Sequence, residues 1–463
     1  MCILEDLCML FEKIVAEGLA HNSYIVGSHG KAAVIDPRRD CEIYIDIAAR
    51  NNCVITHIFE THRNEDYVIG SPELAARCKA EIYHGAAMPF AYGKPVHDGD
   101  RFSLGMIDLT VRETPGHTEE SISLVLTDRE VSDNPFIIFC GDTLFAGDIA
   151  RTDFFGRDRK AEMAEKIWDS ITGKILPLGD GVIVCPAHGA GSVCGEEIAD
   201  HPFTTVGYEK QTNPLLALGR EEFARCRTTE SPYVPPYFRT MEQLNKEGAP
   251  VLCRLPTLIP VSVSGTQDLI RNGCQVLDIR APTSFAAGHL PGSISIWREG
   301  IAAFAGWFLT YSHPVILVDD FNTGLDPVLR QLIRMGYDNI AGYLAGGFPA
   351  WTKAAGETRS FPACTVQQLH ERLEKETPFL LDVRDIKNRE KFGHIRGSHH
   401  RYIGELPAHL DEIPKNEPVV IYCDAGYKGS LAGSILEKNH FHDITNVLGG
   451  MTAWKQAGYR IEK

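Results

Sequence analysis

Short apolar runs alternate with turn residues over the first part of the chain, from about residue 12 to residue 200. Runs of β-branched and aromatic residues bounded by Gly, Pro, Asn or Asp are typical of strands. We expect strands within residues 23–27, 31–37, 53–62, 107–117, 121–126, 136–145 and 180–189. Apolar residues at helical spacing predict helices within residues 71–80 and 159–171. This alternation predicts a layered α/β domain whose loops at strand ends carry the functional residues.

An internal repeat follows a polar, Pro-rich passage at residues 228–238. Each copy has an apolar run that ends in Asp-x-Arg, then a Gly-His pair, then a Gly-Gly turn before an Ala-Trp pair. The copies pair Val276 with Leu380, Asp278 with Asp382, His289 with His394, and residues 344–351 with 447–454. A spacing of about 100 residues predicts two domains of the same α/β fold.

The length of 463 residues is too great for one ordinary core, so about three domains are expected. The predicted boundaries are residues 1–250 for the first domain, 256–360 for the first repeat and 361–463 for the second repeat. The composition, 44% hydrophobic and 23% charged, is that of a globular protein and gives each domain enough apolar residues for a core.

Charge and composition argue against several classes of function. The net charge of −15 and the pI near 5.6 do not favour nucleic acid as a partner, because phosphate binding needs a clustered basic surface. No uncharged run is long enough to cross a membrane, and Glu5 and Asp6 stand where a secretory signal carries basic residues. The thirteen cysteines include no CxxC pair and fit neither a disulfide framework nor a zinc knuckle. We expect a cytoplasmic protein with no membrane partner.

Four of the predicted strands end in loops that carry His or Asp. These residues are His62, His117, Asp142 and His188. A metal ion needs several deprotonated donors that converge from different loops. A single histidine after a strand is usually an ordinary core or surface residue, but four such positions in one domain indicate a metal site.

The order of TH…D, TPGHT, GDTLF and PAHG along the chain resembles the metallo-β-lactamase fold superfamily, in particular its glyoxalase II and persulfide dioxygenase branch. The resemblance covers roughly residues 10–245 and implies an αββα sandwich. The first motif of this superfamily is usually HxHxDH. Here Asn64 and Tyr67 replace two of its histidines, while His62 and Asp66 remain. Because the two-zinc hydrolases of the superfamily use both replaced positions, a two-metal hydrolase is not favoured.

The persulfide dioxygenases of the superfamily hold a single iron at positions that match His62, His117 and Asp142. Two histidines and one carboxylate are the ligand set of non-haem Fe(II) oxygenases, although the same donors also bind zinc or manganese. The resemblance therefore implies one Fe(II) per chain, with zinc as the alternative. The residues expected to surround these ligands and to orient them or the substrate are Asn64, Asp66, Tyr67 and His188.

Three residues outside these motifs are candidates for substrate binding. Arg151 follows the GD loop, and Tyr208 and Lys210 lie in a segment that resembles the family's lining of the thiol-substrate pocket. The two basic side chains would attract an anionic thiol conjugate. The alternative is that both are solvated surface residues.

Cys423 follows an apolar strand in the second repeat and precedes a Gly-containing turn and a helix. A cysteine in such a loop faces backbone N–H groups, so we expect a lowered thiol pKa and a place for a persulfide anion. Its loop resembles that of the rhodanese sulfurtransferase module over residues 362–463, which implies that Asp424, Gly426 and Lys428 bind the sulfur substrate. Lys428 departs from the commoner Arg of that loop and puts the preference for a sulfur donor in doubt. In the first repeat Asp319 aligns with Cys423, so residues 256–360 are expected to be catalytically silent.

The three parts together are similar to the fused persulfide dioxygenase–sulfurtransferases. The resemblance implies that O2 oxidises a low-molecular-weight thiol persulfide to sulfite and free thiol at a mononuclear Fe(II). Cys423 would form or use thiosulfate, and the chain would form a homodimer or homotetramer. The alternatives are a glyoxalase II-like thioester hydrolase with zinc, and a metal-free scaffold with thiosulfate sulfurtransferase activity alone. The sequence leaves open which thiol carries the persulfide and in which direction sulfur moves.

Overall fold

The computed structural model describes residues 9–195 and 197–463, which fall into two compact units. Of the described residues, the first unit comprises 9–195, 197–255 and 333–336, and the second comprises 256–332 and 337–463. Across the described residues, every helix falls short of the length and apolar character that a membrane crossing requires.

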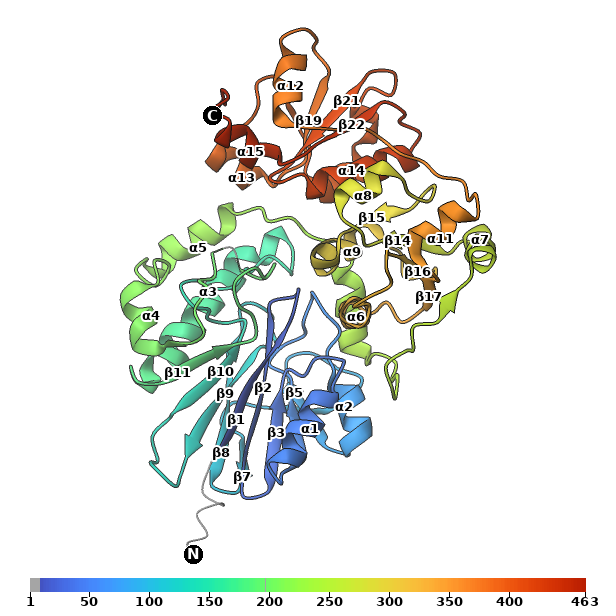
Figure 1. The fold of residues 1–463 in the computed structure, drawn as a ribbon. Coiled ribbons are helices and arrows are strands. Elements are labelled where there is room, and N and C mark those ends of the chain that lie inside the picture. The colour runs from blue at the N-terminus through green and yellow to red at the C-terminus, as the bar shows by residue number, and fades with distance from the viewer. Residues whose placement is uncertain (1–8, 196) are drawn as a thin grey trace, which may run out of the picture. The chain divides into compact units, whose positions relative to one another are not determined.

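Two six-stranded sheets form the centre of the first unit (Figure 1). The first sheet has the order β1-β2-β3-β4-β5-β6, and its strands are β1 (Leu10–Ala16), β2 (His21–Ser28), β3 (Lys31–Ile35), β4 (Val54–Phe59), β5 (Glu81–Gly85) and β6 (Lys94–Val96). The second has the order β12-β11-β10-β9-β8-β7, and its strands are β7 (Arg101–Leu104), β8 (Ile107–Glu113), β9 (Ile122–Asp128), β10 (Ile137–Gly141), β11 (Ile183–Pro186) and β12 (Thr204–Thr205).

Apolar side chains of the two sheets meet in one core, which includes Tyr24, Phe59, Leu109, Leu124 and Phe139. Helices cover the outer faces of both sheets, as Figure 1 shows for this unit. The helices are α1 (Glu42–Arg50), α2 (Ser71–Cys78), α3 (Lys160–Ser170), α4 (Val206–Thr212), α5 (Arg220–Thr229) and α6 (Phe238–Glu247). Shorter helical turns are η1 (Arg157–Arg159), η2 (Ile171–Ile175) and η3 (Leu176–Leu178). The expected αββα sandwich is confirmed, and so are the seven expected strands.

The second unit contains two five-stranded parallel sheets of the same strand order. The first is β13-β17-β16-β14-β15, made of β13 (Pro260–Val261), β14 (Gln275–Asp278), β15 (Ile294–Ser295), β16 (Val315–Val318) and β17 (Ile340–Leu344). The second is β18-β22-β21-β19-β20, made of β18 (Ala363–Cys364), β19 (Phe379–Asp382), β20 (His399–His400), β21 (Val419–Tyr422) and β22 (Ile444–Val447). The duplication inferred from the sequence is therefore present in the fold.

Each repeat carries helices around its sheet. In the first repeat they are α7 (Val263–Arg271), α8 (Pro282–Ala287), η4 (Arg298–Gly300), α9 (Ile301–Phe308), α10 (Asp326–Arg334) and α11 (Gly347–Lys353). In the second they are α12 (Val366–Leu373), α13 (Ile386–Phe392), η5 (Ile403–Ala408), η6 (Leu410–Glu412), α14 (Tyr427–Lys438) and α15 (Gly450–Gln456).

Candidate functional site

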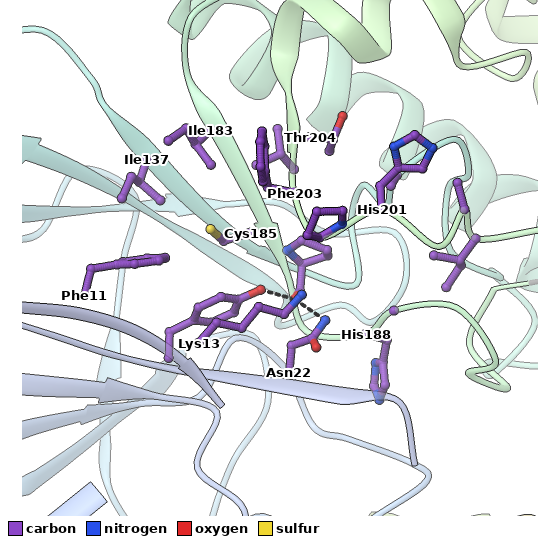
Figure 2. A pocket seen from close by; sticks show the side chains of 18 of the residues that line it. Phe11, Lys13, Asn22, Ile137, Ile183, Cys185, His188, His201, Phe203 and Thr204 are labelled. Carbon is purple, nitrogen blue, oxygen red and sulfur yellow. Dashed lines mark hydrogen bonds between the residues drawn. The ribbon is translucent and has the colours of Figure 1, made fainter. Parts of the chain in front are cut away.

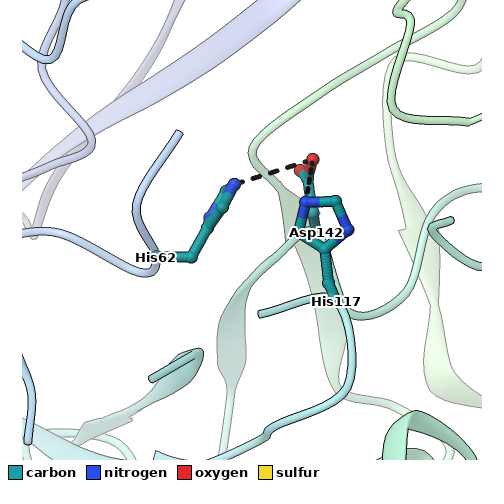
Figure 3. Close-up of side chains that lie close together, drawn as sticks. All are labelled: His62, His117 and Asp142. Carbon is teal, nitrogen blue, oxygen red and sulfur yellow. Dashed lines mark ion pairs between the residues drawn. The ribbon is translucent and has the colours of Figure 1, made fainter. Parts of the chain in front are cut away.

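His62, His117 and Asp142 converge at one end of the sandwich, because the loops after β4, β8 and β10 open at the same edge (Figure 3). His62 Nε2 lies 3.7 Å and His117 Nε2 lies 3.5 Å from Asp142 Oδ2. One donor atom from each of the three residues lies within 4.8 Å of the others. All three side chains are buried, and the expected ligand set is therefore brought together in space.

A hydrogen-bond chain holds the His62 ring in one tautomer. Thr61 Oγ1 donates to Asp36 Oδ2 at 2.8 Å and lies 2.9 Å from His62 Nδ1. Because the single hydroxyl proton of Thr61 goes to Asp36, Nδ1 of His62 is the donor to Thr61. The lone pair then lies on Nε2, the atom that faces Asp142.

Gly141 gives Thr61 and His62 the space that this arrangement needs. Its φ of +54° lies in the left-handed region, which favours glycine. A Cβ at this position would lie 2.6 Å from Thr61 Oγ1 and 3.3 Å from His62 Nδ1. The glycine before Asp142 is therefore required by the close approach of two loops.

His117 is oriented by the main chain. Its Nδ1 donates to the carbonyl oxygen of Arg151 at 2.9 Å, and its ring meets that of Phe154 edge-on at 5.1 Å. A carbonyl oxygen can only accept, so the proton of the neutral ring is on Nδ1 and Nε2 is free to bind.

Burial and charge set the protonation of the cluster. Burial lowers the pKa of His62 to about 4, although Asp142 acts in the opposite direction. Burial alone would raise the pKa of Asp142, but His188 and His62 outweigh it and hold the pKa below its usual range. Burial also acts to lower the pKa of His117, yet Glu65 and Asp142 raise it above the ordinary value. A neutral His62 beside an ionised Asp142 suits a bound cation.

Glu65 is a buried carboxylate at this cluster that the sequence analysis did not single out. Its Oε2 lies 3.6 Å from His117 Nε2 and has no hydrogen-bond partner among the described residues. Burial favours the neutral acid, but His117 lowers the pKa of Glu65 below its usual value. Only its place inside the HRNEDY motif could have marked it.

The four residues expected around the ligands all lie next to the cluster and are buried. Asn64 Nδ2 donates to the carbonyl oxygen of His62 at 3.2 Å. His188 bridges two carboxylates, with Nδ1 at 2.8 Å from Asp142 Oδ1 and Nε2 at 3.1 Å from Asp66 Oδ2. The Tyr67 ring packs on the ring of His21 at a centroid distance of 3.9 Å. Their roles in orienting ligands or substrate stay predictions.

The three residues predicted to bind substrate lie in different surroundings. Arg151 is buried and pairs with both carboxylate oxygens of Asp153, at 2.7 and 2.8 Å. Tyr208 is half-exposed on α4, and the Nζ of Lys210 lies 2.6 Å from Asp180 Oδ1 at the surface. The Arg151 guanidinium is therefore engaged by Asp153. It is the carbonyl oxygen of Arg151, not the guanidinium, that contacts the cluster, at His117.

An apolar cavity of about 350 Å³ adjoins the cluster at His188 (Figure 2). Phe11, Ile137, Cys185 and Phe203 form much of its wall. The Tyr24 hydroxyl donates to the carbonyl oxygen of Pro186 at 2.7 Å and so ties β2 to the end of β11. None of the residues predicted to bind substrate is among those that line it.

Cys423 directly follows β21 and is buried. The N–H of Gly426 donates to Cys423 Sγ at 3.1 Å, and α14 begins one residue later. Burial raises the pKa of the thiol, against the opposing effect of Lys428 and of the amides of Ala425, Gly426 and Gly429. The expected cradle is present, but the expectation of a lowered pKa is wrong because desolvation of the closed thiol outweighs it. Lys428 Nζ lies 2.8 Å from Asp424 Oδ2, so part of its charge is directed to that carboxylate.

Asp319 occupies the matching position after β16, as the sequence predicts. Its Oδ2 accepts the N–H groups of Phe321 at 3.2 Å and Asn322 at 2.8 Å, and it lies 3.0 Å from Arg298 Nη2. The Asp319 carboxylate therefore accepts the backbone N–H hydrogen bonds that a persulfide at this position would need.

The first repeat packs against the helix that follows Cys423. His289 Nε2 lies 2.8 Å from Glu437 Oε2, and Ser295 Oγ lies 3.1 Å from Ser430 Oγ. These contacts support the α14 side of the repeat that carries Cys423.

Comparison with known proteins finds two families along the chain. Residues 16–188 match the metallo-beta-lactamase superfamily, and residues 263–354 and 365–457 each match the rhodanese-like domain. A crystal structure of a metallo-beta-lactamase from Staphylococcus aureus subsp. aureus COL is 30% identical, with a TM-score of 0.66, and the match covers 73% of this chain and 99% of that chain.

Curated relatives resemble parts of the chain. Persulfide dioxygenase ETHE1 of Bos taurus is 27% identical over 213 residues, which are 44% of this chain and 74% of that protein. Hydroxyacylglutathione hydrolase GloC of Haemophilus influenzae is 27% identical over 216 residues, which are 42% of this chain and 91% of that protein. An uncharacterized protein of Mycobacterium leprae is 37% identical over 120 residues, and this chain spans 44% of its length.

Proposed function

Since the chain belongs to the metallo-beta-lactamase superfamily and carries two rhodanese-like domains, we propose that it oxidises a low-molecular-weight thiol persulfide with O2. The products are sulfite and the free thiol, and Cys423 couples this reaction to sulfur transfer. The net oxidation consumes the persulfide RSSH, O2 and water and yields RSH, sulfite and two protons. The likeness to persulfide dioxygenase over 44% of the chain supports the proposal.

The single observation that carries the proposal is a pair of buried imidazole nitrogens without partners. His62 Nε2 and His117 Nε2 both face Asp142 Oδ2, and neither has a hydrogen-bond partner among the described residues. An unsatisfied buried polar atom is costly, and a metal ion is the partner that two histidines and a carboxylate fit. Fe(II) held by this set would supply the redox chemistry that joins a thiolate sulfur to O2.

The surrounding residues keep the cluster ready for this reaction. Thr61 and the carbonyl of Arg151 fix the two rings so that each neutral ring carries its proton on Nδ1 and turns Nε2 inward. His188 holds Asp142 from the other side. The burial of all these groups excludes water, which strengthens the interaction of the cluster with a bound cation.

Cys423 carries the second half of the proposal. Its thiolate takes the outer sulfur of a persulfide and releases the thiol, which leaves a persulfide on Cys423. Sulfite attacks that outer sulfur, so that thiosulfate forms and the Cys423 thiolate is regenerated. The backbone amides around Gly426 stabilise the negative sulfur in both states.

Thioester hydrolysis is the second candidate function. The observation that favours it is a further group of donors next to the first, Asp66, His188 and Cys194. Two adjacent metal ions are the arrangement of many hydrolases. This candidate predicts turnover of a glutathione thioester without O2.

Sulfite production from glutathione persulfide in air tests the proposal. We expect His62→Ala to lower it on the order of 100-fold or more, because a metal ligand is lost. Sulfur transfer from thiosulfate to cyanide by the same variant should be unchanged. His57→Gln is the matched control, because His57 lies on β4, the strand before His62, and packs on Phe59 and Tyr83 instead of the cluster. Equal sulfite production by His62→Ala and the wild-type protein would refute the proposal.

A further inference from the structure

Strands of both sheets and the segment before β12 line the cavity of about 350 Å³ beside His188 (Figure 2). Phe11 comes from β1, Ile137 from β10 and Ile183 from β11, and Phe203 directly precedes β12. We propose that this cavity binds the alkyl chain of a fatty carboxylate, whose carboxylate group pairs with Lys13.

Large aromatic side chains around the cavity remain open to solvent. Phe11, Phe136 and Phe203 all line it and keep 36%, 42% and 68% of their surface exposed. Phe11 is held in place by the rings of Tyr24 and Phe139, at centroid distances of 6.2 and 6.4 Å. Exposed apolar side chains that gather around a concave site mark a place where an apolar ligand binds. The three phenylalanines would gain burial from an alkyl chain.

Lys13 gives the cavity a positive charge without a counter-ion. It follows Phe11 by two residues on β1, so both side chains leave the strand on the same face. Burial lowers the pKa of Lys13, and Cys185 acts in the opposite direction. Burial also raises the pKa of Cys185 to about 12, so this thiol is uncharged at neutral pH. Among the described residues that line the cavity there is no Asp or Glu. The unmatched ammonium therefore favours an anionic head group.

The other polar groups of the wall are engaged by the protein itself. The Tyr24 hydroxyl and Asn22 Nδ2 both donate to the carbonyl oxygen of Pro186, at 2.7 and 3.4 Å. His188 Nδ1 lies 2.8 Å from Asp142 Oδ1. A ligand rich in hydrogen-bonding groups would find few partners inside, whereas an alkyl chain needs none. The inference goes beyond the proposed oxidation and does not rest on it.

Calorimetric titration with single-chain carboxylates tests the site. The full chain is titrated with hexanoate, octanoate and decanoate, each below its micelle concentration. We expect the affinity to rise by about fourfold for each added methylene, because each one is removed from water. Decanol, which lacks the charge, should bind more weakly than decanoate, and decyltrimethylammonium should not compete with it. Absence of decanoate binding, or an affinity that does not depend on chain length, would overturn the inference.

Two variants locate the head group and the chain. Lys13→Met should lower the affinity for decanoate by about tenfold, as loss of a hydrogen bond to a charged group does, and leave decanol binding unchanged. Lys31→Met, at an exposed lysine of β3 away from the cavity, is its control. Phe203→Ala should weaken both ligands, whereas Val131→Ala, at another exposed apolar residue of this unit, should weaken neither. Unchanged decanoate binding by Lys13→Met and Phe203→Ala would overturn the assignment.

Two further measurements separate a free carboxylate from other occupants of this apolar face. Light scattering compares the mass of the wild-type protein with that of Phe203→Asp. A smaller mass for the variant, together with no decanoate binding by the wild-type protein, would assign the face to a second copy of the chain. Co-sedimentation with phosphatidylglycerol vesicles, in the absence of decanoate binding, would assign it to a lipid surface. Either result would contradict the inference. All samples lack persulfide, so failure here is distinct from failure of the proposed oxidation.

Discussion

The two rhodanese-like repeats share a framework and differ at one loop. In both, an arginine pairs with the aspartate at a strand end, at 2.6 Å for Arg280 with Asp278 and 2.7 Å for Arg384 with Asp382. The same arginine donates to the carbonyl of the glycine before the matched histidine in each repeat, at 2.7 and 2.8 Å. The difference begins two strands later along the chain, at Asp319 after β16 and Cys423 after β21.

The loops after these two residues also differ in length. Helix α14 begins at Tyr427, four residues after Cys423, whereas α10 begins at Asp326, seven residues after Asp319. The short loop turns backbone amides toward the sulfur, and the long loop lets a carboxylate accept two amides and contact Arg298. The two repeats therefore share a frame, and the loop after β16 differs from the loop after β21 both in its first residue and in its length.

Cys423→Ser should have the largest effect. We expect sulfur transfer from thiosulfate to cyanide to fall by on the order of 10³-fold or more, because a hydroxyl cannot carry the sulfane sulfur. Persulfide-dependent O2 uptake should persist, since the first cluster is untouched. Cys364→Ser, at a partly buried thiol of β18, is the control. Residual transfer near the wild-type rate would place the nucleophile elsewhere.

Asp319→Cys in the Cys423→Ser background asks whether the nucleophile alone separates the repeats. We expect no recovery of sulfur transfer, because the longer loop does not bring a helix start to the new thiol. The same cyanide assay measures it. Recovery to even a tenth of the wild-type rate would show that the loop length is unimportant.

Lys428→Met should shift the pH dependence of Cys423. The Lys428 charge opposes the rise in the thiol pKa that burial causes, so its removal raises that pKa further. The thiolate fraction at neutral pH then falls, and the rate of alkylation by iodoacetamide should drop several-fold and recover at higher pH. Lys438→Met, at the far end of α14, is the matched control. An unchanged pH profile of alkylation would show that Lys428 does not affect the pKa of Cys423.

Trp297→Ala should have the smallest effect. Trp297 of the first repeat packs on Tyr427, the first residue of α14 after the Cys423 loop, at a centroid distance of 5.0 Å. Loss of such an aromatic pair costs about 0.5–1.5 kcal/mol, so sulfur transfer should fall by roughly twofold to tenfold. Phe321→Ala removes an exposed aromatic of the silent loop and should leave the rate unchanged. Equal rates for both variants would limit the silent repeat to a passive role.

Much of the frame could be predicted from the sequence, because buried strands and the repeat leave long apolar patterns. Strand β1 was not predicted, because most of its side chains are exposed and polar residues interrupt its apolar pattern. The convergence of His62, His117 and Asp142 could be predicted because each residue follows a strongly apolar strand. The burial of Glu65 and Cys194 next to these residues could not be predicted, because it depends on how the loops fold and not on a local sequence pattern. The pKa of Cys423 was missed because burial, a tertiary property, outweighs the local amides.

The most direct test of the central claim is the metal content of anaerobically purified protein, measured together with O2 uptake on addition of glutathione persulfide. The account predicts one iron per chain, whether or not zinc accompanies it, and O2 consumption that depends on the persulfide. Zinc without iron, and no O2 uptake, would contradict the oxidation and favour the hydrolase.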